Sequence, residues 1–430
     1  MDLKPTKPLT GFIELLPAQQ RCFDYCAQRM LDVLRMAGFS VLDLPAIERA
    51  EVLSDKDNWD EIETQMYLFQ KGDTKMGLRY DGTVGLSRYV AGHLNDLVFP
   101  FRAAQFSKRY RGERSQRGRY REFYQMDLDI MGINSLSTNY EAEIIATLMS
   151  AYDSISEFVG KTEVRISNRK FWNAMFEYLE LDDKQSREAF VLIDKRDKID
   201  DFKDALVEII GEQKANIIES IFESGYKSFA SKSEKLAESI AEMDDLIKIL
   251  KTMGVKDAVI DVSIMRGHSY YTGIVFEFFL KDFPEMGAVG GGGRYENLAS
   301  KFSKTKIVGV GSGVGYSKML VGLMEDNKID LSRFENVVDA AVLVMGDANV
   351  PYAMKLVAEL RENGIVAVPY LDTDKKFKNQ IEYADKIGAK YSIIIGDDEV
   401  ANKIVSLKNM ESGAQEPVAL DAIVQKIKVK

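Results

Sequence analysis

Residues 102–130 read RAAQFSKRYRGERSQRGRYREFYQMDLDI, and side chains of opposite character alternate along their last ten positions. The apolar positions share one face: Tyr124, Met126, Leu128 and Ile130. The other face is mainly polar: Phe123, Gln125, Asp127 and Asp129. A period of two predicts a β-strand. Residues 106–111 have a similar pattern, so we expect the loop 112–120 to join two strands as an antiparallel hairpin.

The same stretch concentrates positive charge. Eight of the residues 102–121 are Lys or Arg and Glu113 is the single acid, although the net charge of the chain is −10. A solvated basic loop is the ordinary explanation of such a run. The polar strand beside it indicates another: a surface with arginines at one end for phosphate and carboxylates at the other for an ammonium or imidazole group.

The composition is typical of a globular protein with several domains. The chain has 430 residues, 46% of them hydrophobic and 29% charged, which is enough for about three domains with buried cores. The sequence contains no run of about 18 apolar residues that could span a bilayer. Its N-terminus also lacks the apolar segment of a secretory signal. We therefore expect a cytoplasmic protein without a membrane partner.

Cysteine and histidine are scarce. Cys22 and Cys26 lie four residues apart in a helical pattern. This spacing favours two packing residues over a disulfide. The two histidines, His93 and His268, form no Cys/His cluster at ligand spacing. The sequence therefore assigns no metal ligands among the protein side chains.

Changes in pattern divide the chain into three parts. Charged helix-forming residues dominate 164–255, which predicts a helical insertion. It would interrupt a core formed by residues 1–163 and 256–330. From 336 to 430 apolar strands alternate with helices, which predicts a separate α/β domain with a largely parallel sheet.

Two glycine-rich segments follow the predicted insertion. Residues 287–295 read GAVGGGGRY, which fits either a tight turn or backbone that a ligand approaches closely. Residues 308–318 read VGVGSGVGYSK and match neither a Walker A motif nor the G-x-G-x-x-G fingerprint. A P-loop or dinucleotide site is therefore excluded by spacing.

Five ordered blocks resemble the histidyl-tRNA synthetases, a family of class II aminoacyl-tRNA synthetases. The blocks are LRYDGT (78–83), SKRYRGERSQRGRYREFYQMDLDIMG (107–132), RGHSYYTGIVFEF (266–278), GGRYENL (292–298) and FKNQIEYADKIGAKYSIIIGDDEV (377–400). The resemblance implies an α+β catalytic domain on an antiparallel class II synthetase sheet, a helical insertion and a C-terminal α/β anticodon-binding domain, in a homodimer. It also implies a histidine–tRNA ligase, which activates histidine with ATP and Mg²⁺ and transfers it to the 3′ end of tRNA(His).

By motif matching, the resemblance implies a set of site residues. The catalytic cations at the α-phosphate would be Arg111 and Arg266. ATP would be held by Arg111, Glu113, Phe123 and Lys318. Histidine would be held by Asp81, Thr83, Gln125, Asp129, Arg266, Tyr270 and Tyr271. The tRNA acceptor end would meet Gln116, Arg117 and Arg119. These residue types suit an in-line attack of a carboxylate on a phosphate, which needs positioned cations and no protein nucleophile.

Three residues, in two motifs, depart from the family pattern. Ser317 and Lys318 stand where motif 3 of class II synthetases has glutamate and arginine, and Ser269 stands where the histidine-specific block has aspartate. Lysine keeps the charge of arginine and lacks its bidentate fork, which predicts weaker binding of ATP.

Two other functions compete with the ligase. A histidine-sensing paralogue, similar to the regulatory subunit of ATP phosphoribosyltransferase, would lack the C-terminal domain and have eroded arginines in the block 107–132, which resembles motif 2 of class II synthetases. This chain has both the domain and the arginines. A simple RNA-binding module would leave the polar residues of 123–129 unexplained. Both small-molecule functions require Arg111 and Arg266 to lie close together.

Overall fold

The computed structural model describes residues 4–53, 65–196, 199–265 and 271–428. The predicted site residues Arg266 and Tyr270 lie outside the described residues. Contacts within the chain define two compact units, which are Met1–Glu14 with Phe23–Ile329 and Leu15–Cys22 with Asp330–Lys430.

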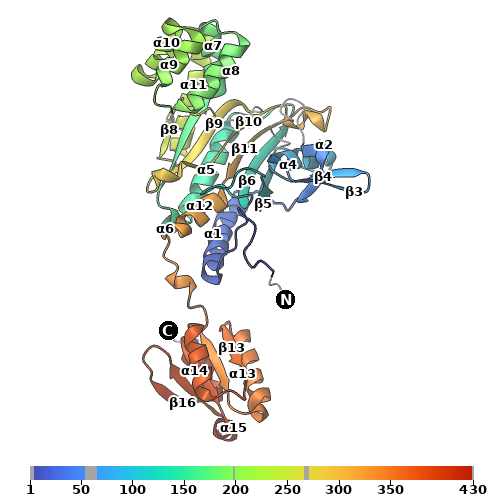
Figure 1. Ribbon diagram of the computed structural model, residues 1–430, viewed down its shortest axis with the longest axis vertical. Coiled ribbons are helices and arrows are strands. Elements are labelled where there is room, and N and C mark those ends of the chain that lie inside the picture. Colours follow the sequence, from blue (N-terminus) through green and yellow to red (C-terminus); the bar gives the residue numbers. More distant parts are fainter. Residues whose placement is uncertain (1–3, 54–64, 197–198, 266–270, 429–430) are drawn as a thin grey trace. The chain divides into compact units, whose positions relative to one another are not determined.

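The first unit is built on an eight-stranded sheet (Figure 1). Its strands are β1 (Ser40–Val41), β5 (Phe101–Tyr110), β6 (Glu122–Ile133), β7 (Thr162–Asn168), β8 (Ala258–Ile260), β9 (Tyr271–Leu280), β10 (Ala288–Tyr295) and β11 (Ile307–Val314). Their order across the sheet is β1-β5-β6-β11-β10-β9-β7-β8. The two edge pairings are parallel and the five between them are antiparallel. The antiparallel sheet expected from the sequence is confirmed.

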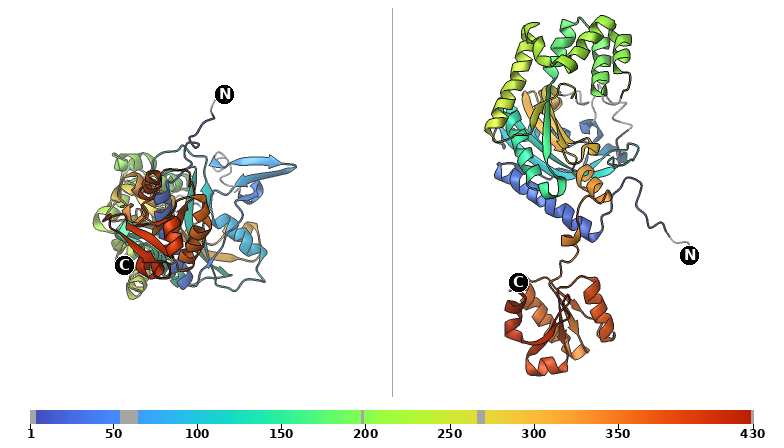
Figure 2. Two further views of the ribbon diagram at one scale, coloured as in Figure 1. Left: turned by 90° about the horizontal axis from the view of Figure 1, so that it is seen from below. Right: turned by 90° about the vertical axis from the view of Figure 1, so that its left-hand side faces the viewer.

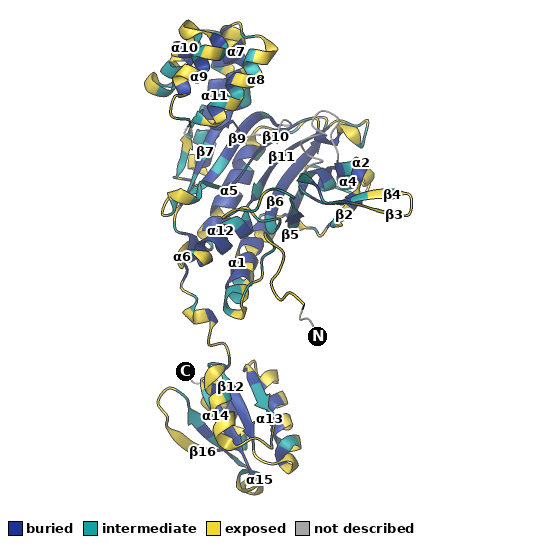
Figure 3. Ribbon diagram, in the orientation of Figure 1, coloured by how far each residue is buried: buried dark blue, intermediate teal, exposed yellow. Residues whose placement is uncertain are grey.

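The predicted hairpin is formed by β5 and β6. Its register places Gln105 opposite Asp127 and Ser107 opposite Gln125. The first strand begins at Phe101, five residues earlier than its pattern indicates. Both faces of β6 are buried over much of its length, which Figure 3 shows in dark blue. The polar side chains of this strand are therefore largely shielded from bulk solvent.

Three helices cover the apolar face of this sheet: α1 (Pro17–Met36), α5 (Asn139–Asp153) and α12 (Tyr316–Glu325) (Figures 1 and 2). Phe23 of α1 packs edge-on against the Tyr316 ring, with 4.7 Å between centroids. The Tyr316 hydroxyl donates a 2.6 Å hydrogen bond to the Phe23 carbonyl. Cys22 and Cys26 form no disulfide and are fully buried, which confirms their interpretation as packing residues.

A small second sheet lies beside the hairpin. It contains β2 (Ile47–Arg49), β3 (Leu68–Lys71) and β4 (Thr74–Leu78) in the order β2-β4-β3. The helices α2 (Ala50–Leu53) and α4 (Thr83–Gly92) adjoin it. Because α4 begins directly after Gly82, which lies against Asp127, the residues at its start lie beside the polar face of β6.

In the described residues of the segment between β7 and β8, five α-helices are present. They are α7 (Arg169–Tyr178), α8 (Asp183–Asp194), α9 (Phe202–Ile210), α10 (Glu212–Ser224) and α11 (Glu234–Thr252). Residues 164–168 belong to β7, which pairs with β8 and β9, so the helices begin only at Arg169. Trp172 of α7 is fully buried and donates a 2.7 Å hydrogen bond to the Val262 carbonyl. The short helix α6 (Ser156–Val159) precedes β7.

The second unit contains a five-stranded α/β domain. Its strands are β12 (Ala340–Val344), β13 (Ala367–Tyr370), β14 (Tyr391–Ile395), β15 (Ile404–Asn409) and β16 (Gln415–Ala419). Its helices are α13 (Val350–Glu362), α14 (Phe377–Lys386), α15 (Asp397–Asn402) and α16 (Ile423–Lys428).

The sheet of this domain is mixed, with the order β13-β12-β14-β15-β16. The first three strands are parallel, and β15 and β16 are antiparallel to their neighbours. The expectation of a largely parallel sheet was therefore wrong for the last two strands. A short turn at Gly413, which has a φ of +75°, joins β15 to β16, and so short a connection permits only antiparallel pairing.

Candidate active site

A cavity of about 520 Å³ lies over the polar face of the main sheet. It brings together most of the predicted site residues: Asp81, Thr83, Arg111, Glu113, Arg117, Arg119, Phe123, Gln125, Asp129, Tyr271 and Lys318. Gln116 does not line it. The backbone N–H of Gln116 instead donates to the Arg119 carbonyl at 3.2 Å, in a tight turn of the basic loop. The backbone N–H of Arg119 donates to the Gln116 carbonyl at 2.8 Å.

Glycines make up the floor of this cavity. The register pairs Gly291 with Gly313 and Gly293 with Gly311, while Gly311 also lies opposite Asp129 on β6. A Cβ on Gly311 would fall within 3.0 Å of the Asp129 carboxyl group. A side chain there would displace the site residue, so only glycine leaves the carboxylate and the backbone accessible to a ligand.

This floor decides between the two interpretations of residues 287–295. Eight of the nine residues form the strand β10, and Gly287 alone occupies the turn before it, with a φ of +60°. The structure therefore supports close approach of a ligand to the backbone rather than a glycine-rich turn.

A carboxylate end of the cavity is formed by Asp81, Asp127 and Asp129. Asp81 accepts hydrogen bonds from the backbone amides of Thr83 at 2.7 Å and Val84 at 3.0 Å, at the start of α4. Asp129 is buried, and this burial raises its pKa well above the usual range. Three carboxylates gathered at one end of a cavity are suited to receive a cationic ligand.

Arginine and an aromatic ring form the opposite end. The Arg111 guanidinium lies over the Phe123 ring, 5.3 Å from its centroid, and its Nε donates to the Tyr80 carbonyl at 3.3 Å. Arg119 lies 3.8 Å from the Glu113 carboxylate. A flat ring beside cations is an arrangement that can stack a base and bind its phosphates.

The two altered motif 3 residues have different roles in the structure. The Ser317 hydroxyl accepts a 2.8 Å hydrogen bond from the Tyr124 amide, so it ties α12 to β6. Lys318 lines the cavity, and its Nζ donates to the Ala288 carbonyl at 2.7 Å. The positive charge predicted for this position is therefore present at the cavity wall.

The basic loop is attached to the C-terminal end of α12. The Tyr120 hydroxyl donates to Oε2 of Glu325 at 3.1 Å, and Arg117 forms an ion pair with Asp326. Burial and the Glu325 charge raise the pKa of Tyr120, so its hydroxyl stays protonated. Nothing in the residues around Glu325 signals this attachment in the sequence.

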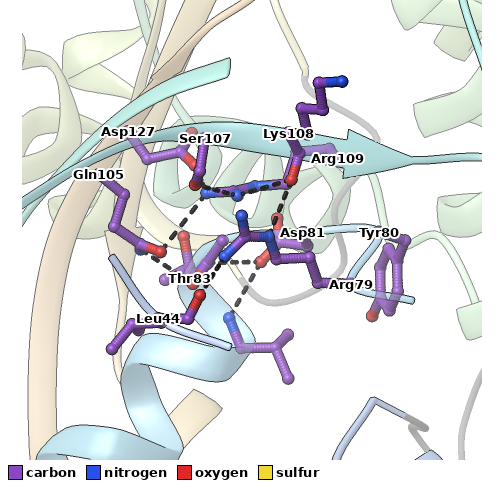
Figure 4. Close-up of polar contacts among 12 residues, drawn as sticks. Leu44, Arg79, Tyr80, Asp81, Thr83, Gln105, Ser107, Lys108, Arg109 and Asp127 are labelled. Carbon is purple, nitrogen blue, oxygen red and sulfur yellow. Dashed lines mark hydrogen bonds and ion pairs between the residues drawn. The ribbon is translucent and has the colours of Figure 1, made fainter. Parts of the chain in front are cut away.

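Two further residues of the site were not predicted. Tyr295 donates a 2.7 Å hydrogen bond to Asp129, although the block GGRYENL had already marked its position. Arg109 forms a buried ion pair with Asp127 behind the cavity (Figure 4). Arg109 was counted only as part of the basic run, and no local pattern distinguishes a buried arginine from a solvated one.

An antiparallel sheet of this order, with an arginine hairpin over a glycine floor and a separate mixed α/β domain, defines a class II aminoacyl-tRNA synthetase. The family model of histidyl-tRNA synthetase matches residues 11–321, and that of an anticodon binding domain matches residues 339–430. The chain belongs to the histidyl-tRNA synthetase family.

Individual relatives agree with this assignment. The histidine–tRNA ligase of Clostridium tetani is 38% identical over 441 residues and covers 99% of both chains. That of Finegoldia magna is 37% identical over 439 residues, which is 98% of this chain and 99% of the relative.

Solved structures with the same fold include two of particular interest. The histidyl-tRNA synthetase from Nostoc sp. PCC 7120 has a TM-score of 0.84 and 30% identity, with 99% of each chain covered. An ATP phosphoribosyltransferase regulatory subunit/histidyl-tRNA synthetase from Bacillus halodurans has a TM-score of 0.73 and 20% identity, with 88% of this chain and 97% of the other covered. At that identity the second likeness shows the fold alone.

Proposed function

We propose that the cavity activates histidine with ATP and that the chain then transfers the histidyl group to the 3′ end of tRNA(His). Histidine–tRNA ligation is the activity of the family to which the chain belongs. The observation that carries the proposal for the site is the glycine floor, with carboxylates at one end and Arg111 over Phe123 at the other.

The proposed roles follow from the charges of the substrates. Asp81, Thr83, Gln125, Asp129 and Tyr271 hold the ammonium and imidazole groups of histidine. Arg111 binds the α-phosphate and stabilises the negative charge that develops there as the histidine carboxylate attacks. Phe123 stacks on adenine, and Glu113 and Lys318 bind the rest of ATP. Arg266 and Tyr270 stay predictions from the family motif.

Mg²⁺ fits the phosphate end of the cavity. This ion keeps several waters and is bound by one or two carboxylates together with substrate phosphates. Glu113 supplies a partly exposed carboxylate beside Arg111 at that end. When bound, Mg²⁺ would neutralise charge on the leaving pyrophosphate.

The tRNA has two proposed contacts on the chain. The loop residues Gln116, Arg117 and Arg119 would meet the acceptor end, because Arg117 and Arg119 lie at the cavity and are more than half exposed. The C-terminal domain, which matches an anticodon binding domain, would bind the anticodon.

We also propose a homodimer in the cytoplasm. Large apolar side chains are exposed on the first unit, among them Val98 at 85% and Ile47 at 48%, and a partner subunit would cover such residues. Light scattering at several protein concentrations would test the dimer. In the described part of the chain, no helix combines the length and apolar content needed to cross a membrane.

The proposed activity is tested by exchange of labelled pyrophosphate into ATP, measured with histidine and with other amino acids, followed by charging of tRNA(His). We expect exchange with histidine alone. Binding of histidine without exchange would instead favour the sensor paralogue, and binding of neither histidine nor ATP would contradict both functions.

A further inference from the structure

We propose that Asp127 makes an additional contact with the α-ammonium group of histidine and that the buried Arg109 is the positioning residue that holds Asp127 for this contact. The inference rests on the proposed function of the cavity. Neither residue was assigned a role from the family motifs.

The two residues form an ion pair inside the hairpin. Nη2 of Arg109 on β5 lies 2.5 Å from Oδ2 of Asp127 on β6, and the side chains are 0% and 4% exposed. Asp127 lines the cavity and Arg109 does not. The arginine is therefore behind the carboxylate, where it cannot touch a ligand itself.

Arg109 is fixed by its own strand. Its Nη1 donates to the Ser107 hydroxyl at 2.7 Å and to the Lys108 carbonyl at 3.2 Å (Figure 4). Gln105, opposite Asp127 in the register, accepts a 3.5 Å hydrogen bond from Nη2 of Arg109 at its Oε1 and donates from its side-chain amide to the Gly82 carbonyl at 3.1 Å. These bonds restrict the guanidinium to one orientation, so the position of Asp127 is determined in turn.

The two oxygens of Asp127 have different surroundings. A Cβ on Gly82 would fall within 3.0 Å of both Oδ2 and the Arg109 guanidinium, so the backbone at Gly82 closes off this side of the pair. A Cβ on Gly313 would lie 2.8 Å from Oδ1. Since Gly313 belongs to the cavity floor, Oδ1 is the oxygen that faces the ligand.

The surrounding charges favour a cationic ligand here. Burial raises the pKa of Asp127, Arg109 and Arg111 lower it, and the nearby Asp81 raises it. Asp129, next on the same face of β6, is the other carboxylate packed beside it, and Asp127 raises the pKa of Asp129 in turn. A bound ammonium would relieve the repulsion among these three carboxylates.

The position along the cavity selects the ammonium rather than the imidazole. Along β6, Asp127 lies between Asp129 and Phe123, and the Phe123 ring lies beneath Arg111, the proposed partner of the substrate carboxylate and α-phosphate. Asp129 lies two residues further along the strand, roughly 7 Å away, and is bonded to Tyr295. Because the ammonium and carboxylate of an amino acid share one carbon atom, the ammonium belongs at Asp127.

Calorimetric binding to the full chain without ATP tests the contact. The ligands are histidine, histidinol, which keeps the ammonium, and imidazolepropionate, which lacks it. We expect Asp127→Asn to weaken binding of histidine and histidinol by roughly ten- to a hundredfold, the usual effect of losing a charge-assisted hydrogen bond. Binding of imidazolepropionate should change by less than about twofold, since it makes no contact with this carboxylate.

The outcomes separate this inference from the proposed function. If the wild-type chain binds neither histidine nor histidinol, the proposed function of the cavity fails. If it binds both and Asp127→Asn weakens all three ligands equally, or none, only the role of Asp127 is overturned.

Arg109 is tested through the pH dependence of histidinol binding. In Arg109→Met, Asp127 loses a cationic neighbour that lowers the pKa of its carboxyl group. As the pH falls, the variant should therefore lose histidinol binding at a higher pH than the wild type does. The pH profile of Arg109→Lys should lie between those of the wild type and Arg109→Met.

A double variant, Arg109→Met with Asp127→Asn, removes the unpaired buried charge and should recover thermal stability but not affinity for histidinol. Recovery of affinity, or an unchanged pH profile in Arg109→Met, would overturn the positioning role.

Discussion

The hydroxyl of Tyr295 on β10 donates a 2.7 Å hydrogen bond to Oδ1 of Asp129 on β6, across the intervening strand β11. The contact is possible because β11 carries glycine at two positions beneath it. A Cβ on Gly309 would clash with the Tyr295 ring, and one on Gly311 would clash with the Asp129 carboxyl group. Three neighbouring strands thus cooperate to orient one carboxylate.

Replacing Tyr295 with Phe should shift the pH dependence of histidine activation. Burial raises the pKa of Asp129 and the Tyr295 bond lowers it. Without that bond the pKa rises further, so the acid limb of kcat/KM for histidine should move to higher pH. We expect a roughly tenfold or larger loss near neutral pH, as for other bonds to charged groups. An unchanged profile would show that Asp129 does not govern histidine binding.

Filling the floor should abolish activity at a moderate cost in stability. Gly311→Ala places a methyl group against the Asp129 carboxyl group, and overpacking of this kind costs about 1–3 kcal/mol. Urea unfolding and pyrophosphate exchange would measure the two effects. Gly92→Ala in α4 is the matched control, because no atom lies within 4 Å of the added Cβ, and it should keep full exchange. Full exchange in Gly311→Ala would contradict the proposed floor.

Lys318 should affect ATP rather than histidine. Its charge lies at the cavity wall, so Lys318→Ala should raise KM for ATP by roughly tenfold, as expected for a lost charge-assisted bond. KM for histidine should stay nearly constant. Lys318→Arg should retain exchange and lower KM for ATP, because a guanidinium can bind phosphate with two donors. A rise in KM for histidine alone would place Lys318 at the wrong end of the cavity.

The attachment of the basic loop to α12 should compete with tRNA. Arg117 pairs with Asp326 although the arginine side chain is 68% exposed. Such exposed pairs typically contribute about 0.2–1 kcal/mol, so Asp326→Asn should lower KM for tRNA(His) by roughly 1.5- to fivefold. Pyrophosphate exchange should not change. Asp245→Asn, which removes an exposed ion pair with Lys248 on α11, is the control. An unchanged KM for tRNA in Asp326→Asn would exclude this competition.

Strong local patterns predicted most of the fold. The alternation in 121–130 and the helical spacing of Cys22 and Cys26 are both found in the structure, as β6 and α1. Local patterns failed where pairing partners decide the outcome. The direction of β15 and β16 and the inclusion of 164–168 in the main sheet depend on strands distant in the sequence.

For the site, the sequence by itself determined the chemical groups and their order along the chain. The resemblance to the family motifs implied Arg111, Asp129 and Lys318, and all three line the cavity. Only the tertiary structure decided which of the basic residues is buried and which oxygens of the carboxylates are free. In the sequence, Arg109 looks like any other arginine of the basic run 102–121, and only the structure shows that β6 brings Asp127 against it. Burial and charge pairing arise between strands, and no local pattern contains them.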